Sequence, residues 1–305
     1  MTATQQLVEA GRLLGLAGGL ALTAWIDLRN REIDDRLWQG LGLWGALLGA
    51  FVEGTGSEIA LLVWLLVAAF ALEHLFPWDE ALGKHGERYL GLIEVAIYLA
   101  VLIVVASAVA RFGLGPGKVP LAAIALLATV ILARGLFELG ILYGGADAKA
   151  VIVVGLLVPL LASPLLVPPA AASPVLAILP FSITMLTNAA VFSLVVPLSV
   201  AVRNVRRGEF SFPAGFTGYS LPVELLPYRF VWVRDPVLGE DGLSEDVETS
   251  AEDQQRRREL AVSLAHKGVR RVWVSPQIPF VVLLALGAFA GILAGNVLLD
   301  LLALI

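Results

Sequence analysis

The sequence contains no cysteine and three histidines among its 305 residues. A chain without cysteine can form no disulfide, carry no thiol nucleophile and hold no cysteine-ligated zinc. Charged residues are also scarce, at 15% against roughly 25% in soluble domains. Lysine and arginine do not gather with aromatic residues into a basic patch, so we expect no nucleic-acid partner.

Hydrophobic residues, by contrast, make up 58% of the chain, and the mean hydropathy is +0.84. They form long runs, and a membrane helix needs about 20 such residues. The runs predict an all-α polytopic membrane protein with about eight transmembrane helices. The expected spans are residues 7–26, 37–52, 59–76, 89–110, 119–143, 148–162, 175–202 and 278–302. The first run lacks the flanking features of a cleaved signal peptide, so we expect a retained span.

Composition changes sharply after the seventh run. The expected parts are a membrane catalytic core at residues 1–202, a small cytosolic α+β insertion at 203–277 and a final transmembrane helix at 278–305. Within the insertion we expect strands at 230–233 and 267–274, a helix at 254–266 and an acidic stretch at 240–253. Connections are expected at residues 77–88 and 163–174, the second rich in proline.

The orientation of the spans follows from Lys and Arg, which favour short cytoplasmic loops. Three arginines between residues 29 and 36 predict that the loop after the first span is cytoplasmic. The arginines of residues 203–207 agree, whereas Arg111 and Lys118 count against this topology. With this orientation, Asp27 and Asp147 both lie at cytoplasmic ends of spans.

One short stretch places ionisable residues between two long apolar runs. It contains Gly144, Gly145, Asp147 and Lys149. Ionisable residues are costly in lipid and usually face a cavity or a partner. The two glycines let a backbone or a substrate approach closely. For Lys149 two interpretations remain open: it binds substrate or steadies a carboxylate, or its chain extends toward the membrane surface.

Two carboxylates at one depth suggest acid–base chemistry. Two close acids cannot both ionise easily, so they share a proton and their pKa values split. We expect Asp147, at a helix start, to be the base that activates water, and Asp27 to be the acid. The pair titrates as a unit, so this division stays open. We prefer Asp27 to Asp34 and Asp35, which we expect to cap the next helix.

These motifs are similar to those of a known family. Residues 27–33 (DLRNREI) followed by residues 144–149 (GGADAK) resemble the membrane-embedded aspartic peptidases of the type IV prepilin peptidase family. Residues 216–222 (FTGYSLP) and 272–280 (VWVSPQIPF) are similar to its archaeal branch, the preflagellin and prepilin peptidases. The family's Gly-x-Gly-Asp is Gly-Gly-Ala-Asp in this chain.

The resemblance implies that Asp27 and Asp147 are catalytic and that no metal or cofactor takes part. The substrates would be archaellin-like or pilin-like preproteins with a basic leader and an apolar helix, cleaved at the cytoplasmic face of the cell membrane. We expect Gly144, Gly145 and Lys149 to support the site, and Pro279 to help bind the scissile segment. Without cysteine, neither the zinc motif nor the methyltransferase activity of bacterial relatives is expected.

The main alternative is an ion- or proton-coupled secondary transporter that uses the same aspartates. Transporters often bind near the bilayer midplane, at interrupted helices related by an internal repeat. The acids in this chain lie at span ends and no repeat is visible, which favours the peptidase. A non-catalytic assembly scaffold is a third possibility. We also expect Arg134 to pair with Glu138, and Gly40, Gly42, Gly45 and Gly49 to permit close helix packing.

Overall fold

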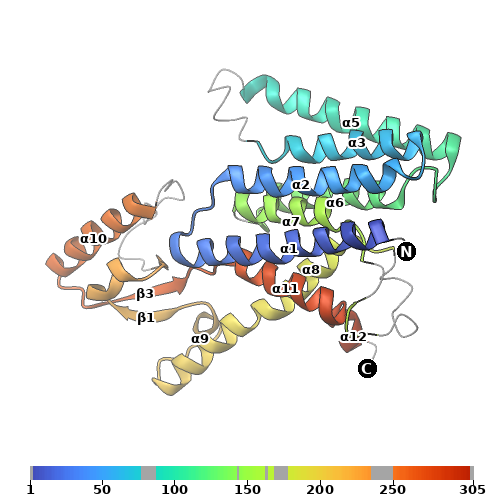
Figure 1. Cartoon of the computed structure of the whole chain (residues 1–305). Coiled ribbons are helices and arrows are strands. Elements are labelled where there is room, and N and C mark those ends of the chain that lie inside the picture. The colour runs from blue at the N-terminus through green and yellow to red at the C-terminus, as the bar shows by residue number, and fades with distance from the viewer. Residues whose placement is uncertain are drawn as a thin grey trace. The chain divides into compact units, whose positions relative to one another are not determined.

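The computed structural model describes residues 3–76, 87–142, 144–161, 164–167, 178–234 and 250–302. Most of these residues are helical, and a small three-stranded sheet forms late in the chain (Figure 1). The expected connections at 77–88 and 163–174 and the acidic stretch at 240–253 lie largely outside the described residues.

The chain folds into two compact units. The first comprises Met1–Trp25, Ile33–Val191 and Val281–Ile305, and the second comprises Ile26–Glu32 and Phe192–Phe280. The second unit therefore starts earlier than the expected insertion at 203–277. It also takes in the end of the first helix, which composition alone gave no reason to assign there.

The first unit is built entirely from helices in its described part. They are α1 (Ala3–Asn30), whose last turn belongs to the second unit, α2 (Asp35–Gly54), α3 (Glu58–Glu73), α5 (Glu87–Phe112), α6 (Leu121–Glu138), α7 (Gly145–Leu157), α8 (Phe181–Ser193), α11 (Phe280–Ala294) and α12 (Val297–Leu302).

Local sequence explains several helix ends. The Asp34 carboxylate accepts a hydrogen bond of 2.8 Å from the Arg36 backbone N–H and caps α2, as expected. Asp35 is the first residue of that helix and is not its cap, contrary to our expectation. At the other end of a helix, Gly140 follows α6 with φ of +65°, a conformation that glycine adopts without steric cost.

Helix α7 forms the core of the first unit. Residues 150–157 are all buried, and the helix packs against α2 and α6. The backbones of α2 and α7 meet at Gly45, where a Cβ would lie 2.7 Å from the carbonyl carbon of Leu156. Gly42 and Gly49 likewise lie against neighbouring side chains, so the prediction of close packing is confirmed at these three glycines.

Four helical segments are long and apolar enough to cross a membrane, counted over the described ranges. They are Gln6–Asn30, Ile93–Phe112, Leu121–Glu138 and Phe181–Arg206. The expected span at 148–162 corresponds to the 13-residue α7. A helix of that length covers about 20 Å, less than the roughly 30 Å of hydrocarbon. The helix ends early because Val158 precedes Pro159, and a residue before proline is driven out of the helical region.

The last of these four segments is interrupted. It consists of α8 and α9 (Val195–Arg206), with a break at Leu194. Pro197 accounts for the break, because its ring would clash with the carbonyl of Ser193 in a continuous helix. In α8, the Asn188 side-chain amide donates hydrogen bonds of 3.2 and 2.9 Å to the carbonyls of Gly287 and Gly295. This amide therefore ties α8 to α11.

The second unit contains the sheet. Strands β1 (Tyr219–Pro222), β3 (Arg271–Pro276) and β2 (Val231–Val233) pair antiparallel in the order β1-β3-β2. Helix α10 (Ser250–His266) contributes Leu264 to a core with Leu226 and the strand residues Val231 and Val274. The expected strand at 230–233 and the helix are confirmed. Strand β1 was missed, and β3 starts later than expected because the chain turns at Gly268, with φ of +76°.

The Gly45 contact leads to a stability prediction. Gly45→Ala should destabilise the first unit by about 1–3 kcal/mol, because the new methyl group meets the α7 backbone and not a side chain that could move. Gly40, also expected at a helix contact, faces open space. Gly40→Ala is therefore the matched control and should leave stability unchanged or slightly raised.

Thermal unfolding of the purified protein in detergent, followed by circular dichroism, measures both variants. Equal unfolding temperatures for Gly45→Ala and Gly40→Ala would contradict the close approach of α2 and α7.

Candidate active site

Asp147 lies in the first turn of α7. Gly144 is the N-cap residue and offers no side chain to the free N–H groups of that turn. The Asp147 side chain turns back toward this end: a Cβ on Gly144 would lie 3.0 Å from its Oδ2 atom. The partial positive charge of a helix start favours an ionised carboxylate. The half-buried Asp147 is thus held where a carboxylate can act as a base, which agrees with the expected helix start.

Lys149 is engaged by an acid from another helix. Its Nζ atom lies 2.5 Å from Oδ1 of Asp35, and the exposed fractions of the two side chains are 19% and 30%. This charge-assisted hydrogen bond joins the starts of α7 and α2. Of the two interpretations of Lys149, the structure agrees with the steadying of a carboxylate. Asp35 itself was expected as a cap, so its role as an ion-pair partner was missed.

Gly145 leaves one side of this helix start open. Among the described residues, a Cβ at Gly145 would meet nothing within 4 Å, unlike one at Gly144. The described neighbours therefore leave the Gly145 side of the first turn accessible. Gly144, Gly145, Asp147 and Lys149 are brought together by their shared place at the start of α7.

Asp27 is in the last turn of α1 and belongs to the second unit. The residue is 8% exposed. Arg31 follows it with φ of +60°, and its backbone N–H donates to the Asp27 carbonyl at 3.2 Å. Burial lowers the pKa of Arg31, and the Asp27 carboxylate opposes part of that shift. Asp27 is thus a buried acid with a cation close by.

Arg31 also connects this turn to the sheet of the second unit. Its guanidinium lies 5.0 Å from the centre of the Phe230 ring, and that of Arg257 lies 5.3 Å from the same ring. Such cation–π contacts fix the position of the chain just after Asp27. Pro279 is half-buried and immediately precedes α11, and it too belongs to the second unit.

The two expected catalytic acids therefore belong to different compact units. Asp147 is grouped with Lys149 and Asp35, whereas Asp27 is grouped with Arg31. Their meeting across one water molecule stays a prediction.

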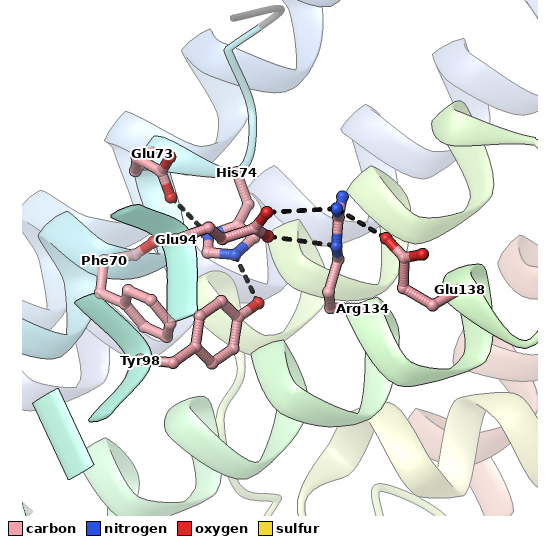
Figure 2. Close-up of polar contacts among 7 residues, drawn as sticks. All are labelled: Phe70, Glu73, His74, Glu94, Tyr98, Arg134 and Glu138. Atoms are coloured by element: carbon pink, nitrogen blue, oxygen red, sulfur yellow. Dashed lines mark hydrogen bonds and ion pairs between the residues drawn. The ribbon is translucent and has the colours of Figure 1, made fainter. Parts of the chain in front are cut away.

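A second polar cluster joins α3, α5 and α6 (Figure 2). The expected pair of Arg134 and Glu138 is confirmed at 2.6 Å, and Arg134 Nε also lies 3.2 Å from Glu94. His74 Nε2 lies 2.6 Å from the Tyr98 hydroxyl. Sequence reasoning missed the contacts of Glu94, His74 and Tyr98 in this cluster, although Glu94 interrupts an apolar run. In the described residues no group of three or more acids or histidines has the arrangement of a metal site.

Comparison with known proteins adds no family assignment: no family model matches the chain, and no curated protein is significantly similar to it.

The ion pair of Asp35 and Lys149 leads to a second stability prediction. Lys149→Met should cost about 1–2 kcal/mol, since it leaves a half-buried carboxylate without its cation. Asp35→Asn should cost a similar amount. Asp34→Asn, one residue away, should be nearly neutral because Asn caps a helix as well as Asp.

Thermal unfolding of the two single variants and of the double variant gives the coupling energy. We expect a coupling energy of about 1 kcal/mol between the two residues. If the losses of unfolding free energy in the single variants add up to the loss in the double variant, the ion pair does not contribute to stability.

Proposed function

We propose that the protein is a membrane-embedded aspartic endopeptidase that removes class III signal peptides from archaellin-like or pilin-like preproteins at the cytoplasmic face of the cell membrane. In this proposal the apolar segments make up about eight membrane helices and residues 203–277 form a cytosolic insertion. The proposal makes the chain a member of the prepilin peptidase family, in its archaeal branch. It is supported by the order of the two aspartate motifs along the chain.

The observation that carries the proposal is the position of Asp147. Its carboxylate lies beside Gly144 at the start of α7, and no described residue lies within 4 Å of where a Cβ on Gly145 would be. An ionised carboxylate in that position can take a proton from a water molecule. A peptide backbone can approach because neither glycine carries a side chain.

The reaction would proceed by attack of water on the scissile carbonyl. Ionised Asp147 takes one proton from the water while protonated Asp27 donates its proton to the carbonyl oxygen. The tetrahedral diol then collapses: the now ionised Asp27 takes a proton from one diol hydroxyl as the C=O bond re-forms, the C–N bond breaks, and the proton held by Asp147 passes to the leaving amine. Each step requires that one acid be protonated and the other ionised. Two acids that share one proton are in this state. No metal or cofactor is required.

A second candidate function is a proton-coupled transporter. The cluster of Figure 2 favours it, because three helices contribute ionisable groups to one place. Against it, His74 is the C-cap of α3, so the cluster lies at the end of that helix and not at its middle. Proton uptake into vesicles containing the protein, lost in Glu94→Gln, would favour the transporter.

Cleavage of a tagged archaellin or pilin precursor in membranes tests the peptidase. Asp27→Asn and Asp147→Asn should each reduce cleavage by about 10²-fold or more, because each removes a group that transfers a proton. Asp34→Asn is the matched control, since it changes an acid of the same loop that only caps α2. Undiminished cleavage by Asp147→Asn would exclude this mechanism.

A further variant tests the placement of the Asp147 carboxylate. Gly144→Ala would introduce a Cβ at 3.0 Å from Oδ2 and displace the carboxylate by a few tenths of an ångström. We expect kcat to fall by about 10- to 100-fold with a smaller change in KM. Gly135→Ala on α6, where a Cβ meets nothing within 4 Å, is the control.

Steady-state cleavage of a purified precursor measures both constants. If Gly144→Ala kept the kcat of Gly135→Ala, the Asp147 carboxylate would not be the reacting group.

A further inference from the structure

The second unit contains a cavity of about 480 Å³ whose walls are rich in arginine. Arg203 and Arg207 line it from α9 and its C-cap, Arg229 from the segment before β2, and Arg271 from β3. Among the described residues that line it, Glu209 is the one acid. All of these residues belong to the same compact unit.

The cavity has a surplus of positive charge. Glu209 lies 3.6 Å from Arg271, which also donates a hydrogen bond of 2.8 Å to the Ser220 hydroxyl. In the part of the chain that the structure describes, Arg203, Arg207 and Arg229 pair with no carboxylate. One arginine is therefore compensated, and three guanidinium groups are available to an anion.

The Arg203 side chain is positioned by a contact with Tyr219 and has a free hydrogen-bond donor. Its guanidinium lies over the Tyr219 ring, with Cζ 3.8 Å from the ring centre. Its Nε–H is buried and finds no acceptor among the described residues. A planar guanidinium fixed by stacking loses little freedom when it binds an oxyanion, and its fork of donors matches phosphate oxygens.

The cavity lies at the end of a candidate membrane span. Leu198, Val202 and Val205 lie on one face of α9, and each is more than half exposed, as is the N-cap residue Leu194. This face belongs to the candidate span Phe181–Arg206, which ends at the arginines of the cavity. A helix that leaves the hydrocarbon at this point brings Arg203 and Arg207 to the depth of lipid phosphates.

We propose that this cavity binds a phosphate group, as a phosphomonoester or phosphodiester anion, with an anionic phospholipid headgroup as the nearest source. The surplus of guanidinium groups selects an anion, and the same charge excludes a basic peptide leader from this cavity. The proposal does not depend on the peptidase activity.

Binding to the full-length protein in detergent tests the proposal. The probes are short-chain phosphatidylglycerol, short-chain phosphatidylcholine and inorganic phosphate, each titrated against the thermal unfolding temperature. Arg207→Gln with Arg229→Gln removes two charges from the lining. Arg206→Gln with Arg234→Gln removes two exposed charges that do not line the cavity, and it is the matched control.

We expect phosphatidylglycerol to stabilise the wild-type protein, phosphatidylcholine to have much less effect, and the lining variant to bind about thirtyfold more weakly. The control variant should keep the wild-type affinity. If inorganic phosphate binds as tightly as phosphatidylglycerol with the same loss in the lining variant, the source is a soluble phosphate. Tighter binding of phosphatidylglycerol identifies the lipid.

Three results would overturn the proposal: no binding of either anionic probe, equal binding of phosphatidylcholine and phosphatidylglycerol, or equal losses in the two double variants. If the lining variant unfolds, the single variants Arg207→Gln and Arg206→Gln give the same comparison, because both residues are exposed at the end of α9.

Discussion

The packing of α7 against α2 is the contact on which the first unit depends. Helix α7 is short and nearly all apolar, so its stability comes from burial and not from its own length. Gly45 lets the two backbones approach at one end of the contact, and the ion pair of Lys149 with Asp35 closes the other. Together they fix the start of α7, and with it the Asp147 carboxylate. A reactive acid carried by a loop would have no comparable support.

The same end of the first unit collects most of its described charges, and the alternation of the helices explains why. Helices α2 and α7 start at this end, while α3 and α6 finish there, so Asp35, Lys149, His74 and Arg134 share it. The Gln39 amide near the start of α2 reaches the Leu75 carbonyl after α3, at 3.4 Å, which agrees with this arrangement. Charges gather at helix ends because hydrocarbon offers them no water. The proposed peptidase site, which must admit water, meets the same requirement.

Sequence reasoning correctly predicted the features that depend on residues close together in the sequence. Apolar runs located the helices, an acid before a run located the Asp34 cap, and i,i+4 spacing located the pair of Arg134 and Glu138. It missed contacts between residues that are far apart in the sequence. Lys149 and Asp35 are 114 positions apart and His74 and Tyr98 are 24 apart, so no local pattern connects them. At 148–162, where we expect a membrane span, the structure has the buried 13-residue α7. Hydropathy cannot tell burial inside a protein from burial in lipid, because both demand the same side chains.

The arginine-lined cavity and one of the two acids of the proposed reaction belong to the same compact unit. Asp27, Arg31 and the arginine-lined cavity all belong to the second unit, and Arg31 contacts Phe230 next to the sheet. A phosphate bound in the cavity would hold this unit at the level of the lipid headgroups, and Asp27 would be held with it. The proposed cleavage just before an apolar helix requires an acid at that depth. Under both proposals, lipid binding would set the height of Asp27 while α7 sets the position of Asp147.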